Sequence, residues 1–317
     1  MVIVAVAGGS GQVAREVIDA LVASKKHDIS ILSRRKPPPT GIAPGITWKV
    51  VDYDDKENLM VTLQGVHTLL SFVQILSDTD QKSQKNLIDA AIGAGVKRFA
   101  PSEYGSKETV DMAWWAGKER IREYLKKVNQ VESKLEYALF QPGLFLDYLA
   151  FPYKTARYVD PLQSVFDFEN RRAIVVDGHE DALMTLTTVA DFAAVVARAV
   201  DYEGKWPTVG GIVGNRVPVS QLLEIGRRVR GRQFTVDRVK IDDLNAGRLN
   251  TTWSPETVHQ AVSKDLALAL LKAVSIGILL SSSKGAWDSS DELNQLFPEY
   301  EFTSVEHFLQ MCWKDKP

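Results

Sequence analysis

Short apolar runs alternate with helical patterns through the first half of the chain. The runs, which are typical of buried strands, lie at residues 2–7, 28–33, 46–53, 66–73, 96–100 and 134–143. Between several of them, apolar residues recur every three or four positions, and this spacing predicts helices at 13–22, 56–64 and 79–94. Strands and helices that alternate in this way form a parallel sheet covered by helices on both faces. The sequence therefore predicts a Rossmann-type, doubly wound α/β fold.

The pattern loosens after about residue 150. We predict one further strand at 171–178 and helices at 187–200, 219–231 and 303–313. Thr188 and Asp191 stand at the start of the first of these helices with the spacing of an N-terminal capping box. The resulting division is a Rossmann domain at residues 1–150 and a smaller, mostly helical lobe at 151–317. We expect some elements of the lobe to return to the first domain.

Composition narrows the class of protein. With 317 residues, of which 45% are hydrophobic and 25% charged, the chain can bury a large core. Its formal net charge of -2 gives no general electrostatic footprint for nucleic acid. We therefore expect a small-molecule partner and no nucleic acid, and the oligomeric state stays open.

Cysteine usage and hydropathy suggest a cytoplasmic protein. Cys312 is the only cysteine, so the chain forms no internal disulfide and has no thiolate cluster for a metal such as zinc, and a reducing compartment suits it. The longest apolar tract, residues 266–280, contains Lys272 and is shorter than the roughly 20 residues needed to cross a bilayer. We expect a buried helix there and no membrane association. No charged leader precedes the first predicted strand.

The first predicted strand runs into the glycine-rich sequence GGSGQVA, and a predicted helix follows directly. A tight turn at Gly8 and the missing side chain at Gly11 would let backbone N–H groups approach a pyrophosphate, and Ala14 is small enough for close packing. We predict that this loop binds the cofactor through Gly8, Gly9, Ser10, Gly11, Gln12 and Val13. The alternative is a turn that only connects a strand to a helix.

The end of the second predicted strand indicates which dinucleotide binds. An acidic residue about 20 residues beyond the loop would bind the ribose 2′-hydroxyl of NAD. That place is occupied instead by Ser33, Arg34, Arg35 and Lys36. Arginine matches a phosphate monoester bidentately and lysine adds a point charge, so these residues predict NADPH as the cofactor. The alternative is a solvated basic turn.

Residues that follow the other predicted strands complete the candidate site, because ligands bind beyond the carboxyl ends of parallel strands. We predict that the cofactor also contacts Phe72, Val73, Gln74, Ser102, Gln141 and Pro142. We predict that the substrate contacts Glu103, Tyr104, Trp114, Gly143, Leu144 and Phe145.

Orthodox short-chain dehydrogenases use a Tyr and a Lys separated by three residues, and this chain lacks that pair. Tyr104 and Lys107 are one residue too close, and Trp114 occupies the tyrosine position before Lys118. The segments GGSGQVA, SRRK, NLIDAAIGAGVKRFAPSEYG and AGKERIREYL nevertheless resemble the NmrA-like and isoflavone reductase-like group of atypical short-chain reductases. The resemblance covers roughly residues 1–150. That group typically has GVKRFxPSEFG, so Tyr104 replaces a phenylalanine.

The resemblance implies that Lys118 is the catalytic or cofactor-positioning group, because it matches the lone lysine of that group in position. Its ammonium could hold the ribose hydroxyls of the cofactor or, when desolvated, protonate a substrate oxygen. The expected function is an NADPH-dependent reductase that transfers hydride to a small aromatic or conjugated substrate. Two alternatives stay open: an NAD(P)-binding redox-sensing regulator without turnover, and a non-redox enzyme that steers a rearrangement or cyclisation.

Overall fold

The computed structural model describes residues 2–38, 44–256 and 264–316, and the chain divides into two units. Unit 1 is made of Met1–Tyr104, Trp115–Phe140 and Phe192–Gly210. Unit 2 is made of Gly105–Trp114, Gln141–Asp191 and Gly211–Pro317. From residue 141 to residue 191 the chain belongs to unit 2, and residues 192–210 belong to unit 1 again.

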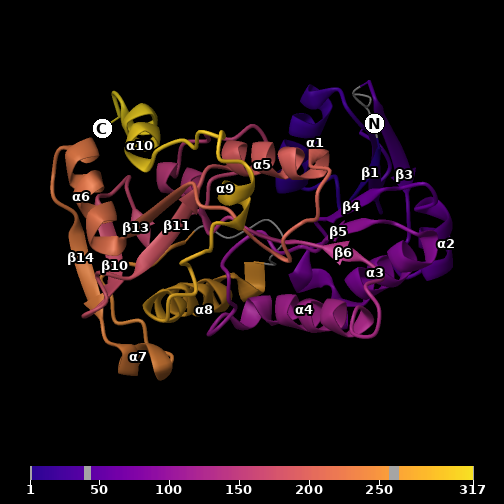
Figure 1. Cartoon of the computed structure of the whole chain (residues 1–317). Coiled ribbons are helices and arrows are strands. Elements are labelled where there is room, and N and C mark those ends of the chain that lie inside the picture. The colour runs from indigo at the N-terminus through magenta and orange to yellow at the C-terminus, as the bar shows by residue number, and fades with distance from the viewer. Residues whose placement is uncertain (1, 39–43, 257–263, 317) are drawn as a thin grey trace. The chain divides into compact units, whose positions relative to one another are not determined.

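Unit 1 is built on a six-stranded sheet whose strand order is β3-β2-β1-β4-β5-β6 (Figure 1). The strands are β1 (Ile3–Ala7), β2 (Asp28–Ser33), β3 (Ile46–Val50), β4 (Thr68–Ser71), β5 (Arg98–Ala100) and β6 (Glu136–Tyr137). Every neighbouring pair in this sheet is parallel. The predicted Rossmann-type fold is confirmed, and the strand order reverses between β1 and β4, which is where such sheets bind ligands.

Helices cover both faces of this sheet. They are α1 (Gln12–Ser24), α2 (Lys56–Thr62), α3 (Lys82–Ala94) and α4 (Ala116–Val128), and Figure 1 shows α1 on the face opposite α3 and α4. Ala5 and Ala7 of β1 belong to a core that includes Leu87 of α3 and Ile121 of α4. The intervening Val6 is also fully buried. Burial on both faces explains why the strands are continuous apolar runs rather than alternating ones.

The helix predicted at 79–94 begins later than its apolar spacing suggests. Asp80 and Gln81 have positive φ angles of 52° and 54°, so the chain forms the separate 3₁₀ turn η2 (Thr79–Gln81) before α3. The Asp78 carboxylate then accepts hydrogen bonds from the N–H groups of Ser83 (2.8 Å) and Gln84 (3.1 Å). Gly95 ends the helix with a φ of +75°, as predicted.

Unit 2 combines helices with two three-stranded sheets. One sheet has the order β13-β11-β8, and the other has the order β14-β10-β9. The strands are β8 (Leu144–Phe145), β9 (Phe166–Asp167), β10 (Arg172–Val176), β11 (Leu183–Thr187), β13 (Asn215–Pro218) and β14 (Thr235–Val239). The helices are α6 (Val219–Arg230), α7 (Ile241–Asn245), α8 (Lys264–Ser283), α9 (Glu292–Leu296), α10 (Val305–Trp313) and the 3₁₀ turn η4 (Leu146–Ala150). The remaining strands, β7 (Leu139–Gln141) and β12 (Val209–Gly211), pair with each other.

The predicted capping box forms only in part. The Thr188 hydroxyl accepts a hydrogen bond from the Asp191 N–H (3.0 Å) at the start of α5 (Val189–Asp201). The Asp191 carboxylate does not complete the box, because it accepts hydrogen bonds from the Tyr300 hydroxyl (2.8 Å) and the Thr303 N–H (3.0 Å). The Asp191 carboxylate thus binds Tyr300 and Thr303, which are distant in sequence, instead of the N–H of Thr188.

The apolar tract 266–280 lies in α8. Its residues of known burial are buried only in the C-terminal part, at Ser275, Gly277, Leu279 and Leu280, whereas Lys272 is exposed. Within the described parts of the chain, no helix has the length and apolar character that crossing a membrane requires.

Candidate functional site

The turn at Gly8 is fixed by its neighbours on both sides. Its N–H donates hydrogen bonds to the Leu32 carbonyl (3.0 Å) and to the Tyr53 hydroxyl oxygen (2.7 Å). Its φ is +70°, and a Cβ added to it would lie 2.7 Å from the carbonyl oxygen of Phe72. Only glycine fits here, so the end of β1 lies directly against the chain that leaves β4.

Gly11 faces open space instead. It is exposed and is the N-cap of α1, and an added Cβ would meet only the Gly8 carbonyl oxygen, at 3.2 Å. No described side chain caps this helix, and its first turn, which the structure describes completely, holds no acidic residue. The first N–H groups of a helix lack intrahelical acceptors and carry partial positive charge. The loop therefore fits a pyrophosphate.

The basic turn after β2 is joined to this loop. The Ser33 hydroxyl donates to the Ser10 hydroxyl oxygen (3.4 Å) and accepts from the Arg35 N–H (3.1 Å). Arg34, Arg35 and Lys36 are exposed, and none of them forms an ion pair within the part of the chain that the structure describes. Their charges are available to a phosphate beside the glycine loop.

An aromatic pair lies beyond β4 and β5. The ring of Tyr104 stacks on that of Phe72, with centroids 4.4 Å apart and planes inclined by 14°, and meets the edge of Phe192 at 5.3 Å. The Tyr104 hydroxyl is buried and has no hydrogen-bond partner among the described residues. Burial raises the pKa of this phenol well above its usual range, so the group stays protonated and can donate a hydrogen bond.

Lys118 is held in the first turn of α4. Only 3% of the residue is exposed, and its amine donates a hydrogen bond to the Glu103 carbonyl and lies 3.4 Å from the centroid of the Trp115 ring. Burial lowers the pKa of this lysine to about 7, against the opposing effect of the Glu103 carboxylate. Near neutral pH the amine is thus able both to hold and to release a proton.

The Glu103 carboxylate has a partner within the protein, and the contact of this residue with the substrate stays a prediction. Its side chain is buried, and its two carboxylate oxygens accept hydrogen bonds from Nε (3.0 Å) and Nη2 (2.7 Å) of Arg122. Sequence reasoning missed Arg122, although its spacing of four residues from Lys118 places both side chains on one face of α4. Both oxygens of the Glu103 carboxylate are thus bound within the protein, by Arg122.

The other residues predicted to contact the cofactor are placed as follows. Phe72, Val73 and Gln74 follow β4, and Val73 is buried whereas Gln74 is exposed. Ser102 follows β5, and its N–H donates to the side-chain oxygen of Gln84 (3.0 Å). Together with the glycine loop, these residues gather at the carboxyl edge of the sheet in unit 1.

The remaining predicted site residues belong to unit 2, and their roles in binding stay predictions. They are Trp114, Gln141, Pro142, Gly143, Leu144 and Phe145. Gly143 has a φ of +73°, and an added Cβ would lie 2.2 Å from the Thr185 carbonyl oxygen, so the turn requires glycine. The Trp114 ring lies against Gly277 of α8.

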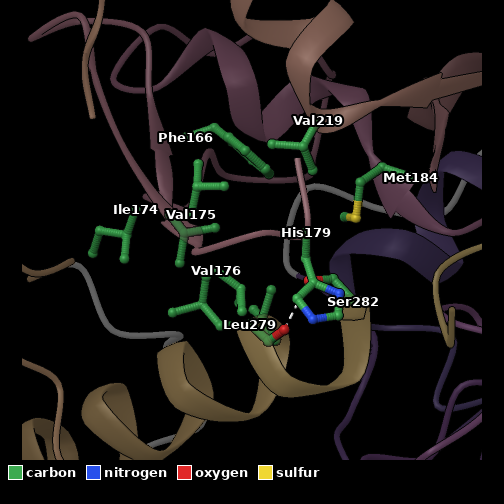
Figure 2. Close-up of a pocket in the computed structure, with 11 residues that line it drawn as sticks. Phe166, Ile174, Val175, Val176, His179, Met184, Val219, Leu279 and Ser282 are labelled. Carbon is green, nitrogen blue, oxygen red and sulfur yellow. Dashed lines mark hydrogen bonds between the residues drawn. The ribbon is translucent and has the colours of Figure 1, made fainter. Parts of the chain in front are cut away.

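Two cavities in the described parts of the chain differ in size and in place. Figure 2 shows the first, in unit 2, where His179 and Ser282 join apolar side chains around about 10 Å³. That volume holds about one water molecule and no substrate. The second, of about 560 Å³, lies in unit 1 beside Val2, His27, His67 and Arg98, at the amino ends of the strands. Rossmann-type sheets bind ligands at the opposite edge, where the glycine loop is.

Comparison with known proteins matches residues 2–309 to the NmrA-like family. An oxidoreductase of Botryotinia fuckeliana, BOA1, is 31% identical over 237 residues, which is 74% of this chain and 78% of that protein. The oxidoreductase swnN of Metarhizium robertsii is 28% identical over 338 residues, covering 99% of this chain and 98% of that protein. An NADPH complex of the NADPH-dependent quinone oxidoreductase of Escherichia coli has a TM-score of 0.70 at 21% identity, covering 98% of this chain and 100% of that one. This structural likeness supports the fold.

We expect Gly11→Val to abolish dinucleotide binding without unfolding the protein. Valine would fill the space in front of α1, while its backbone conformation (φ -72°, ψ 159°) suits any residue. Calorimetric titration with NADPH would measure binding, and thermal unfolding would measure stability. Gly8→Ala is the contrasting variant, because its Cβ would collide with the backbone and lower the Tm. Wild-type affinity in Gly11→Val would mean that the loop only connects a strand to a helix.

Proposed function

The chain belongs to the NmrA-like family, and on that premise we propose that it is an NADPH-dependent reductase of a small aromatic or conjugated organic substrate. The observation that carries the proposal is Lys118, a buried lysine of α4 with a pKa of about 7 whose amine binds the carbonyl of Glu103, shortly after the end of β5. Because the Tyr-x-x-x-Lys pair is missing, the enzyme is an atypical short-chain reductase with a lone lysine.

The residues of unit 1 fit NADPH. The exposed N-terminus of α1 at Gly11 would hold the pyrophosphate, and the exposed cations Arg34, Arg35 and Lys36 would hold the 2′-phosphate. The bound cofactor would supply the hydride. Phe72, Val73, Gln74 and Ser102 would line the remainder of its site. Both oxidoreductase relatives and the NADPH complex of the quinone oxidoreductase support this assignment.

Lys118 would act at the nicotinamide end of the cofactor. Its amine can bind the ribose hydroxyls as an ammonium, and it can give a proton to the substrate oxygen that hydride transfer leaves negative. A regulator that only senses the cofactor needs the dinucleotide site but not a buried lysine with a pKa near 7. This lysine is the reason that we prefer an enzyme to a regulator.

The aromatic pair indicates the class of substrate. Phe72 and Tyr104 offer a stacked aromatic surface, and the Tyr104 hydroxyl lacks a partner among the described residues. A buried donor without an acceptor costs free energy, and an oxygen of a quinone or another conjugated carbonyl compound would satisfy it. Trp114, Gly143, Leu144 and Phe145 stay candidates for further contacts. A reducing, cytoplasmic setting agrees with the single cysteine.

We expect Arg34→Ala to weaken NADPH binding far more than NADH binding, because the variant loses a contact that only the 2′-phosphate makes. A charge-assisted hydrogen bond of this kind contributes about 1.5 to 3 kcal/mol, or roughly 10- to 150-fold in Kd. Lys25→Ala is the matched control, since it removes one exposed cation at the far end of α1. Titration calorimetry of both cofactors decides the matter, and equal wild-type affinities for NADPH and NADH would contradict the assignment.

We expect Lys118→Met to lower kcat by about 100-fold or more, the scale of a positioned proton-transfer group. Cofactor affinity should fall less. In the wild type, kcat should decline as pH rises above about 7, because the ammonium form is lost. Lys118→Arg keeps its charge, so any residual activity should not show that decline. A substrate would first be found by following NADPH oxidation with aromatic enones, quinones and benzylic ethers. Wild-type turnover by Lys118→Met would refute the assignment.

We expect Tyr104→Phe to raise KM for an oxygen-bearing substrate by about five- to tenfold, the scale of one lost hydrogen bond. The stacked ring remains and no buried hydroxyl is left without a partner, so the Tm should not fall. NADPH affinity should stay unchanged in the same variant. An unaltered KM would show that the hydroxyl does not contact the substrate.

A further inference from the structure

We infer that Arg122 is a positioning residue for Lys118: by clamping the Glu103 carboxylate, it fixes the Glu103 carbonyl on which the lysine amine rests. The inference builds on the proposed function of Lys118 and adds Arg122, which neither the sequence pattern nor the comparisons assign. It concerns three side chains that lie within unit 1 and are all buried.

The clamp is bidentate and sheltered from water. Nε and Nη2 of Arg122 each donate to one oxygen of Glu103, and the two side chains are 9% and 1% exposed. Two parallel hydrogen bonds between a guanidinium and a carboxylate fix the orientation as well as the distance of the pair. Nη1 of Arg122 also donates to Glu119 (3.2 Å), about one turn earlier in the helix, so the guanidinium cannot turn freely.

Glu103 transmits this constraint through its own backbone. Its N–H donates to the Pro101 carbonyl (2.8 Å), and its carbonyl accepts from the Lys118 amine. Lys118 and Arg122 are one turn apart on α4, so one rigid helix holds Glu103 at both ends. The lysine amine is thereby kept over the Trp115 ring rather than extended into solvent.

The pair also sets the electrostatic surroundings of the amine. The charged groups that act on Lys118 are Glu103, whose carboxylate raises its pKa, and Arg122, which lowers it. Neighbouring elements α3 and η2, and the turn η1 (Ile75–Ser77), direct their described charged groups elsewhere. Lys82 binds Asp54, Lys85 faces the Tyr124 ring, Asp89 binds Tyr124 and Lys56, Asp78 caps α3, and Asp80 is exposed.

The test reads the position and the charge of the amine directly, without a substrate. Lysine labelled with ¹³C at Cε gives one NMR signal per residue, and the Lys118 signal is identified by its loss in Lys118→Arg. In the full-length protein the Trp115 ring should shift this signal strongly upfield. Arg122→Lys keeps the charge but loses the fork, so we expect the upfield shift to diminish. Arg120→Met is the matched control on α4, because Arg120 binds Gln81 instead, and it should leave the signal unchanged.

A pH titration of the same signal distinguishes a specific effect of Arg122 and Glu103 on Lys118 from a general loss of local packing. Arg122→Met should raise the pH midpoint of Lys118 by about one unit, and Glu103→Gln should lower it by about one unit. Midpoints that stay fixed, or that move in the same direction, would overturn the inference. If either single variant fails to fold, the double variant with both changes is measured instead, because it leaves neither the carboxylate nor the guanidinium without its partner. The upfield shift should be lost in the double variant, and a wild-type shift there would also overturn the inference. If these shifts occur but no compound is ever reduced, the clamp stands and the proposed function of Lys118 fails.

Discussion

The close approach of Gly8 to the chain leaving β4 is the constraint on which the candidate site depends. A side chain at this position would collide with the Phe72 carbonyl, so the end of β1 could not lie against β4. Because Gly8 is held there, the exposed N-terminus of α1 starts at the point where the strand order reverses. Phe72 in turn stacks on Tyr104, the residue after Glu103. One backbone contact thus places the glycine loop, the stacked rings of Phe72 and Tyr104, and the Glu103 carbonyl that binds Lys118 along the same edge of the sheet.

Local patterns predicted the features that depend on local physics. The alternation of buried strands and helices follows from apolar periodicity, and the glycine loop follows from a turn that only glycine adopts, and both are read within a few residues. The cations after β2 could be identified in the same way, since their position in the fold is fixed by the strand that they end. The positions of the glycine loop and of the basic turn could therefore be predicted from the sequence.

Features that depend on distant partners were not predicted. The Glu103 carboxylate was expected to contact the substrate, but its partner is Arg122, 19 residues away on another element. Asp191 has the spacing of a capping residue, yet its carboxylate binds Tyr300, 109 residues away. Strands such as β8 and β9 have two residues each and show no period that a sequence could reveal. In each case the choice among possible partners is made by tertiary packing.

A rise in pH has opposite effects on the contribution of Lys118 to folding stability and on the proposed reaction. The pKa of Lys118 is about 7 in the fold and 10.5 for an unperturbed lysine, so between these values the unfolded chain binds more protons. The contribution of Lys118 to stability therefore grows as pH rises from about 7 to 10.5. The ammonium form that the proposed reaction uses is lost over the first part of that range. A buried ion pair beside such a lysine is rarely the most stable choice for a core, since apolar side chains of similar volume often stabilise a fold more. In the proposed reaction, Glu103 and Arg122 would keep a poorly solvated amine in place for proton transfer, at some cost in stability.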